Sequence, residues 1–220
     1  MDFRVLNSVN KFNSYPLPIF EETVSTLHGS KYFTVLHFYS GFWQLNIAES
    51  HKEKTTFTVP SGHHEFQRLP FGLANSPANF QRLMDTVLRD LIGPECWAFD
   101  DIVIFSRSIE HVQRLENVLQ RFKAASLQLQ PGKCLIAQPK VQYLGYVLSE
   151  EEITASPDKI KAVTQYPTPN GVKHVRAFIG LASSYRRLVP DFAKLAKPLM
   201  TRERTSSLRG VQPKRRLLKV

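Results

Sequence analysis

Residues Glu95–Phe105 read ECWAFDDIVIF, and the fold is decided by this stretch. The residues on both sides of the acidic pair Asp100-Asp101 are mostly aromatic, apolar or β-branched. Flanks of this kind predict two short buried strands joined by a tight turn that carries the two acids. Adjacent carboxylates between apolar flanks repel each other and lose hydration, so they need a cation or the hydrogen bonds of a turn. From this stretch alone, two interpretations stay open: a hairpin that binds a cation, and an ordinary Asp-rich turn.

Two amphipathic helices are predicted on either side of this hairpin. The first has Ser76 as its expected N-cap and Pro77 as its first helical residue, and the second extends from Ser108 to about Ala125. Apolar residues at three- and four-residue spacing predict that one face of each helix packs in the core and is not a cofactor site. These faces are Phe80, Leu83, Met84, Val87, Leu88 and Leu91 in the first helix, and Ile109, Val112, Leu115, Val118, Leu119 and Phe122 in the second.

The rest of the chain divides into a mixed part and a helical part. In the mixed part we expect a helix over Pro18–Leu27, strands over Tyr32–Leu36, Gly41–Ile47, Leu127–Gln130 and Tyr143–Leu148, and a hairpin within 54–69 that turns at Pro60-Ser61-Gly62. In the helical part we expect helices over Pro157–Thr164, Val172–Val189 and Phe192–Met200. The boundary between the two parts is predicted near residues 150–156.

Composition places the chain among ordinary globular proteins, with 42% hydrophobic and 22% charged residues. Its net charge is +10, but the acid-free stretch after Glu203 carries six positive charges and is expected to be a solvated tail. No apolar run approaches the roughly 18 residues of a membrane helix, and no secretory signal is evident. The cysteines, Cys96 and Cys134, match no metal-ligand spacing and are expected to stay reduced. These features predict an intracellular protein that does not enter a membrane.

Six motifs follow one another along nearly the whole chain from Asp2 to Met200. They are Asp2–Asn7 with Tyr15–Pro18, Phe33–His37 with Ser40–Gln44, Leu69–Gln81, Asp100-Asp101, Tyr143–Tyr146, and Val172–Pro198. Together they resemble the reverse transcriptase domain of gypsy-like retrotransposons with long terminal repeats. An Asp-Asp pair alone is a weak signal, whereas six motifs in one order are specific.

The resemblance implies an α+β fold, the palm of a right-hand polymerase, in which an antiparallel sheet is backed by helices. Partial fingers and a helical thumb or connection would accompany the palm. Residues 1–150 would form the partial fingers and the palm, 151–204 the thumb and connection helices, and 205–220 a basic disordered tail.

The resemblance also implies a function, RNA-directed DNA polymerase within a larger Pol polyprotein. Its partners would be a nucleic-acid template-primer and deoxynucleoside triphosphates. Catalysis would be a phosphoryl transfer assisted by two Mg²⁺ ions, which prefer oxygen ligands. The carboxylates of Asp100 and Asp101 would be the catalytic metal ligands.

Further site residues follow from the same resemblance. Phe42 would stack under the incoming sugar, and Phe71 and Gly72 would face the nucleotide. The primer grip would be Tyr143, Leu144, Gly145 and Tyr146. On residue type alone, Phe42 is also consistent with a core position and Gly72 with an ordinary loop glycine.

The chain departs from the family pattern at three places. His37 stands where the family has the first catalytic aspartate, and a neutral imidazole offers Mg²⁺ one nitrogen lone pair and no negative charge. Ala98 stands where the family usually has a tyrosine. The family's basic residues that clamp the triphosphate lie upstream of the segment at Arg4, so a truncated copy is expected.

Three hypotheses remain open. The chain is a reverse transcriptase domain that needs a larger assembly, a catalytically dead remnant that still binds template-primer, or a structural or interaction protein in which the two acids only form a turn. The loss of a carboxylate at residue 37 favours impaired or absent activity, since removing one member of a cooperating catalytic set costs several powers of ten in rate.

Overall fold

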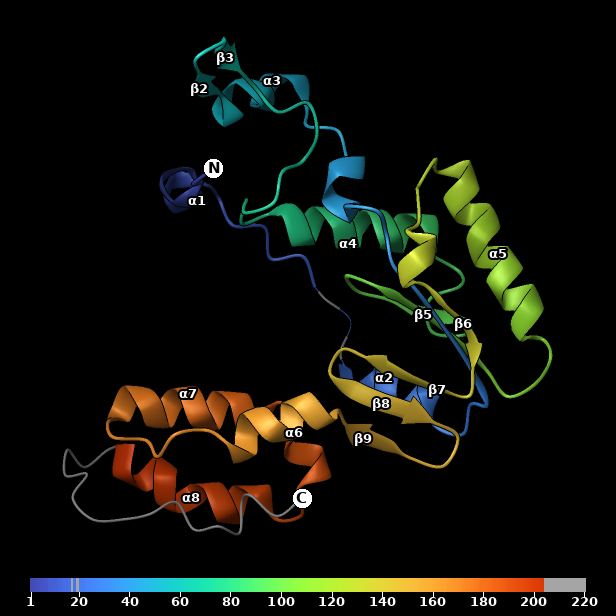
Figure 1. Cartoon of the computed structure of the whole chain (residues 1–220), viewed down its shortest axis with the longest axis vertical. Coiled ribbons are helices and arrows are strands. Elements are labelled where there is room, and N and C mark those ends of the chain that lie inside the picture. The colour runs from blue at the N-terminus through green and yellow to red at the C-terminus, as the bar shows by residue number, and fades with distance from the viewer. Residues whose placement is uncertain (17, 19, 204–220) are drawn as a thin grey trace. The chain divides into compact units, whose positions relative to one another are not determined.

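The structure, a computed structural model, describes residues 1–16, 18 and 20–203 (Figure 1). The chain forms two compact units: Met1–Val141 with Ser149–Glu152, and Gln142–Leu148 with the chain from Ile153 onward. The second unit therefore includes chain that precedes the boundary expected near residues 150–156. The tail predicted over 205–220 lies outside the described residues.

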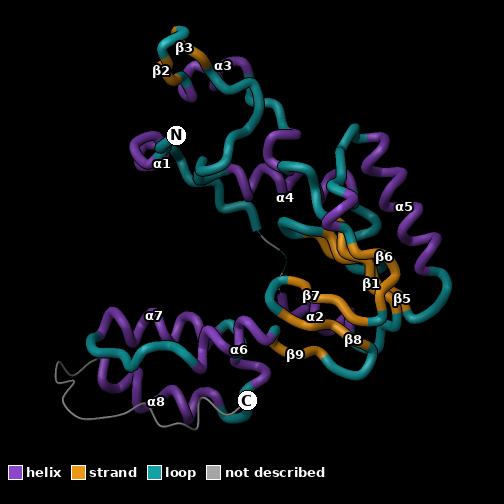
Figure 2. The backbone as a smooth tube through the Cα atoms, viewed as in Figure 1, coloured by secondary structure: helices purple, strands orange, loops and turns teal. Residues whose placement is uncertain are grey.

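A four-stranded antiparallel sheet forms the centre of the first unit, with the strand order β4-β5-β1-β6 (Figure 2). Its strands are β4 (Cys96–Ala98), β5 (Ile102–Ser106), β1 (Tyr32–Leu36) and β6 (Leu135–Gln138). All residues of β4 and β5 are buried, as expected for β-branched and aromatic strands covered on both faces. The predicted hairpin is confirmed, and the acidic pair lies in the turn between these two strands.

Two long helices contribute to the core of this unit, α4 (Ser76–Val87) and α5 (His111–Ala124). Both were predicted, but their bounds differ. Leu88 and Leu91, expected on the face of the first helix, follow its end at Val87, although both are buried in the core. The N-cap of α4 is Asn75, because the Ser76 hydroxyl donates to the carbonyl of Pro70 (3.1 Å) instead of capping the helix. The core includes Leu36, Phe38, Phe80, Met84, Leu88, Ile102, Ile104, Val118 and Phe122.

The predicted apolar face of α5 is wrong at its start. Ile109 and Val112 are 81% and 61% exposed, and Leu119, farther along the predicted face, is 39% exposed. Because the helix begins only at His111, Ile109 precedes it, and the face toward the sheet includes His111, Val118 and Phe122. Spacings of seven and four residues keep these three side chains on one face of the helix.

The remaining elements of the first unit are short. They are α1 (Arg4–Val9), α2 (Phe20–Leu27), α3 (Glu49–Lys52), the strands β2 (Phe57–Val59) and β3 (Gly62–His64), and 3-10 helices over Gly41–Gln44, Glu53–Thr55 and Pro131–Lys133. The predictions of α2 and of the β2–β3 hairpin are confirmed, except that α2 begins at Phe20 and the hairpin is shorter than expected. The strand expected over Leu127–Gln130 is wrong, because only Leu129 forms an isolated bridge, with Phe38.

The strand expected over Gly41–Ile47 is also wrong. Ser40 adopts a left-handed conformation (φ 49°), which breaks the extended chain and starts the 3-10 helix Gly41–Gln44. The Gln44 amide then ties this turn to a distant segment. Its nitrogen donates to the carbonyls of Tyr39 and Gln128, both at 2.8 Å, and its oxygen accepts from the Gln128 N–H at 2.7 Å.

Within residues 142–203, the described part of the second unit contains three α-helices, α6 (Pro157–Thr164), α7 (Val172–Ser183) and α8 (Phe192–Glu203). The bounds of α6 are those predicted, and α8 extends three residues beyond its prediction. The helix expected over Val172–Val189 ends early, because the chain turns after Ser183 into a 3-10 helix over Arg186–Leu188.

A three-stranded sheet with the order β7-β8-β9 consists of β7 (Lys140–Tyr143), β8 (Tyr146–Ser149) and β9 (Ile153–Ala155). The single strand expected over Tyr143–Leu148 is wrong. Leu144 and Gly145 have positive φ values of 48° and 83°, so the chain reverses there and separates β7 from β8. Among the described residues, no helix combines the length and apolarity needed to cross a membrane.

A buried polar network joins α5 to the sheet. The Ser106 hydroxyl donates its hydrogen to the carbonyl of Ser108 (2.9 Å), so toward His111 Nδ1, at 3.1 Å, it can only accept. Nδ1 of His111 therefore carries a proton, and in the neutral ring Nε2 accepts from the Thr34 hydroxyl at 2.7 Å. Thr34 Oγ1 also accepts from the Ala137 N–H at 2.9 Å. The network is complete only when the His111 ring is neutral.

We expect acid to destabilise the fold through His111. Burial, and to a lesser degree the charge of Arg114, lowers the pKa of this imidazole in the folded chain. The unfolded chain then binds more protons, so the free energy of unfolding falls as the pH drops below about 6.5, the ordinary pKa of histidine. Urea unfolding at pH 7.5 and pH 5.0 should show a smaller pH effect in His111→Gln than in the wild type. His28→Gln is the matched control at an exposed site, and an unchanged pH effect in His111→Gln would contradict the expectation.

Candidate active site

His37 and Asp101 meet at one end of the sheet. His37 follows the last residue of β1, Asp101 precedes the first residue of β5, and the antiparallel register pairs Leu36 with Ile102. Nδ1 of His37 lies 2.5 Å from Oδ1 of Asp101, and each side chain is about one third exposed. The expectation that residue 37 lies across from the acidic pair is confirmed, while the catalytic roles stay predictions.

The electrostatics of the acidic turn are dominated by burial. Loss of water around its half-buried carboxylate raises the pKa of Asp101 above its usual range, and the neighbouring His37 opposes this rise. The like charge of Asp100 raises the pKa further, and Lys133 lowers it. Asp100 itself is exposed. Two carboxylates and two basic side chains therefore act on one another in this part of the molecule.

A pocket of about 420 Å³ opens at the acidic turn. Of the predicted site residues it brings together His37, Phe42, Phe71, Asp100 and Asp101. Gly72 is outside the lining, next to Phe71, and its φ of 92° needs a glycine. The predicted primer grip, Tyr143–Tyr146, belongs to the second unit, where Tyr143 and Tyr146 are buried and Leu144 is 39% exposed.

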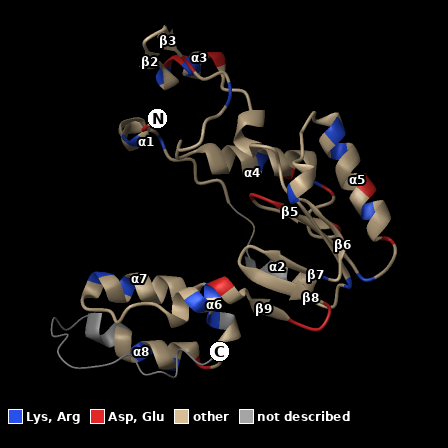
Figure 3. Ribbon diagram, viewed as in Figure 1, with Lys and Arg blue, Asp and Glu red and all other residues tan. Residues whose placement is uncertain are grey.

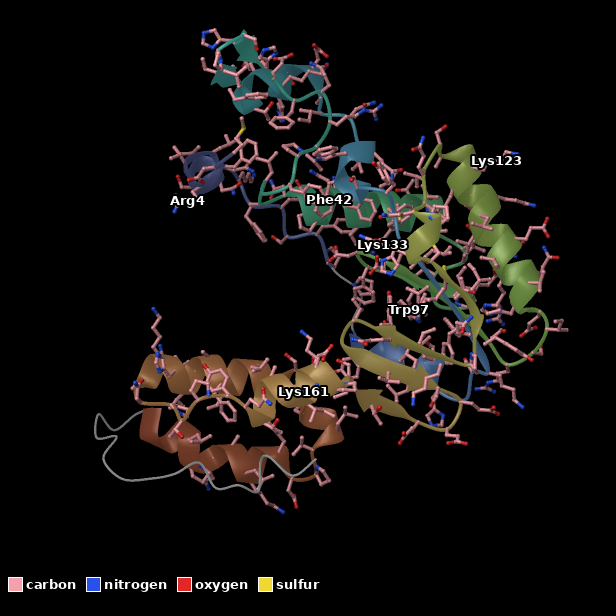
Figure 4. The ribbon with its side chains drawn as sticks, viewed as in Figure 1. Arg4, Phe42, Trp97, Lys123, Lys133 and Lys161 are labelled. Carbon is pink, nitrogen blue, oxygen red and sulfur yellow. The ribbon has the colours of Figure 1, made fainter. Side chains whose placement is uncertain are left out.

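Six lining residues were not predicted for the site. Phe38, Ser40, Gly41 and Phe80 belong to or adjoin the predicted motifs, whereas Gln130 and Lys133 lie outside them. These last two residues flank the Pro131-Gly132 turn, and Lys133 ends the 3-10 helix Pro131–Lys133. Phe42 and Lys133 reach the same pocket from separate elements (Figure 4). A basic residue directly after a Pro-Gly turn was the one available signal, and it does not indicate which part of the fold the residue will face.

Carboxamide side chains hold the chain around the pocket. Asn7 Nδ2 donates to the carbonyl of Gly72, and Asn7 Oδ1 accepts from the Ala74 N–H, both at 2.8 Å. Gln81 is 2% exposed and donates from Nε2 to the carbonyl of Ala98 at 3.0 Å. Because a carboxamide both donates and accepts, it can fix a loop that has no strand partner. Asn7 therefore holds the loop after Phe71, and Gln81 holds strand β4. Gln44 holds the turn at Phe42 in the same way.

The donor set does not fit the two-ion site that the resemblance implies. Two ions roughly 4 Å apart need oxygen ligands that converge from different strands, and β1 delivers the imidazole of His37 instead. His37 Nδ1 and Asp101 Oδ1 are 2.5 Å apart, so each atom occupies the direction from which a metal ion would approach the other. Among the described residues, no group of three or more His, Cys, Asp or Glu side chains is placed to hold a metal.

We expect the close approach at Gly41 to be essential to the pocket. A Cβ there would lie 3.0 and 3.1 Å from two ring atoms of Phe80, which is 2% exposed and cannot move away. Gly41→Ala should therefore lower the free energy of unfolding by about 1–3 kcal/mol. Gly132→Ala, at a glycine with no atom within 4 Å of its Cβ position, is the matched control and should change stability little. Equal stability of the two variants in urea unfolding would contradict this account of the 3-10 helix Gly41–Gln44.

Comparison with known proteins gives one consistent result. Residues 1–148 match the family model described as reverse transcriptase (RNA-dependent DNA polymerase). The chain is 41% identical over 201 residues to a retrovirus-related Pol polyprotein from transposon opus of Drosophila melanogaster, and 40% identical to that from transposon gypsy. A transposon Tf2 polyprotein of Schizosaccharomyces pombe is 33% identical. These matches cover 90% of this chain but only 20%, 19% and 15% of the three relatives, so the chain spans a fifth or less of their length.

Solved structures agree on the fold. A foamy viral protease-reverse transcriptase in complex with double-stranded DNA superposes with a TM-score of 0.83 at 23% identity, covering 99% of this chain and 39% of that one. The same viral protein in complex with an RNA/DNA hybrid gives a TM-score of 0.76, covering 99% and 30%. The predicted α+β polymerase fold is confirmed.

Proposed function

The chain belongs to the reverse transcriptase family, and on that premise we propose that it is the RNA-directed DNA polymerase domain of a retrotransposon Pol polyprotein, with impaired nucleotide transfer. The observation that carries the proposal is the contact of His37 with Asp101, at the position where the family pattern has an aspartate. The first unit would be the partial fingers and palm, and the helices of the second unit the thumb and connection.

The pocket supports nucleotide binding in this proposal. Phe42 and Phe71, whose ring centroids are 5.2 Å apart, line it together with the acidic turn. The Phe42 ring would lie under the sugar of an incoming nucleotide and exclude a 2′-hydroxyl by contact. Gly72 would let the backbone approach the nucleotide closely. Lys133 would place a positive charge near the phosphates.

Transfer itself is the step that we expect to fail. It requires attack of a primer 3′-hydroxyl on a phosphate whose developing charge is stabilised in place. Reverse transcriptases generally use divalent metal ions for this, and in this chain we propose that Mg²⁺ is the ion and that Asp100 and Asp101 bind it weakly. His37 removes one carboxylate from the site and occupies Oδ1 of Asp101. The chain can then position a template-primer without turning over nucleotides at the family's rate.

Template-primer binding is supported by charge as well as by fold. Four basic residues lie on α6 and α7, where Figure 3 colours parts of the ribbon blue: Lys159, Lys161, Lys173 and Arg176. The foamy viral relative is bound to double-stranded DNA and to an RNA/DNA hybrid, and we extend that ligand class to this chain. Lys and Arg contacts to phosphates supply much of the affinity of such complexes.

The test of impaired transfer is primer extension on a poly-ribonucleotide template, first with Mg²⁺ and then with Mn²⁺. We expect no extension by the wild-type chain. His37→Asp restores the third carboxylate and should raise extension by about a hundredfold or more above the wild type. His28→Asp makes the same change in charge at an exposed residue and should have no effect. Strong Mg²⁺-dependent extension by the wild-type chain would overturn the impairment.

The test of nucleic-acid binding is filter binding of a template-primer over a salt series. Between 50 and 200 mM salt the affinity should fall by about 10³-fold if several phosphates are contacted. Lys161→Gln should reduce the slope of log affinity against log salt by about one. Binding that does not depend on salt, or no binding, would leave the hypothesis of a structural or interaction protein.

A further inference from the structure

The two tryptophans of the chain have opposite environments. Trp97 is 8% exposed and its indole N–H donates to the Thr26 hydroxyl at 2.7 Å. Trp43 is 53% exposed, and Phe71, whose ring centroid is 6.1 Å from that of Trp43, is 54% exposed. Burying a large aromatic side chain stabilises a fold by about 1.5–3 kcal/mol, so two such neighbours at the surface leave that gain unused. Adjacent exposed aromatic rings of this kind mark an interaction site.

The backbone keeps Trp43 at the surface. The Trp43 N–H donates to the carbonyl of Ser40 at 2.8 Å, within the 3-10 helix Gly41–Gln44. The next residue, Gln44, makes three hydrogen bonds to Tyr39 and Gln128. The turn is therefore held before any ligand arrives, and a ligand that stacks on the indole does not have to order it.

Trp43 lies beyond the nucleotide pocket. Phe71 is between the two rings of the turn, 5.2 Å from Phe42 and 6.1 Å from Trp43, measured between centroids. Phe42 and Phe71 line the pocket, and Trp43 is not among the lining residues. A base on Trp43 would therefore be a neighbour of the nucleotide in the pocket rather than that nucleotide itself.

A positive charge accompanies the rings. Arg68 is exposed, and its guanidinium donates to the carbonyl of Gln44 at 3.1 Å, directly after Trp43 in the chain. Aromatic side chains next to a guanidinium are typical of surfaces that hold single-stranded nucleic acid, where bases stack on the rings and the cation attracts the phosphates.

We propose that Trp43 and Phe71 form a stacking platform for an unpaired base of a bound nucleic-acid strand, with Arg68 as the adjoining phosphate contact. The inference rests on the proposed function, because it assumes that the chain binds nucleic acid. It adds Trp43, which does not line the nucleotide pocket. It also adds a ligand outside that pocket, an unpaired base. The platform should bind a strand that carries unpaired bases more tightly than a strand that offers only phosphates.

Tryptophan fluorescence tests the platform directly. Trp97→Phe leaves Trp43 as the one tryptophan, and Trp43→Phe leaves the buried Trp97. Both variants and the wild type are to be titrated with two template-primers of the same duplex. One has an unpaired thymidine overhang and the other an abasic overhang. We expect quenching by the thymidine overhang in Trp97→Phe and in the wild type, and little quenching in Trp43→Phe. If Trp97→Phe does not fold, the difference between the wild type and Trp43→Phe reports the same signal.

Affinity gives a second measurement. Anisotropy of a labelled template-primer should show that Trp43→Ala weakens binding of the thymidine overhang by about five- to one hundredfold. The same variant should leave binding of the abasic overhang unchanged. Val59→Ala, at another exposed apolar residue of the same unit, is the matched control and should change neither affinity.

The outcomes separate this inference from the proposed function. Binding by anisotropy with equal quenching by thymidine and abasic overhangs overturns the platform and leaves the proposed function intact. If free thymidine triphosphate quenches Trp43 as strongly as the thymidine overhang does, the ligand of the platform is not a base of a bound strand, and the inference is overturned. No binding of either duplex by anisotropy overturns both.

Discussion

The pairing of β1 with β5 is the constraint on which the rest of the first unit depends. Its register sets Leu36 against Ile102, so the residue after one strand meets the residue before the other. Both strands are almost wholly buried, and a slip of one residue would turn every core side chain to the opposite face. Position 37 therefore meets the acidic turn whatever side chain it carries.

That constraint explains why the side chain at position 37 acts directly on the acidic turn. The fold is shared with the foamy viral protein, whose superposition covers nearly the whole chain. Directly after β1, however, this chain carries an imidazole, and it contacts Asp101 directly. The imidazole satisfies the half-buried carboxylate of Asp101 from within the protein, a task that we propose belongs to a bound cation where the family has an aspartate.

Side-chain amides, together with strand pairing, hold the surroundings of the pocket. Asn7, Gln44 and Gln81 each link segments far apart in sequence, and they hold the loop after Phe71, the turn at Phe42 and the strand before the acidic pair. These contacts keep the aromatic rings in place around a polar centre. They also explain why Trp43 can remain at the surface, since the turn that carries it is held by its neighbour Gln44 rather than by its own burial.

The sequence by itself determined the acidic hairpin, β1, α4, α5 and α6, because alternation of buried strands, helical spacing and proline or glycine ends are local properties of the chain. It also indicated the family, from motifs in order. Only the tertiary structure decided the 3-10 turn at Phe42, the reversal at Leu144-Gly145 and the exposure of Ile109, because each depends on a left-handed residue or on where a helix meets the sheet. The same holds for Gln130 and Lys133 at the pocket, and for the exposed rings of Trp43 and Phe71. Contacts between residues distant in sequence arise from packing, which no local pattern encodes.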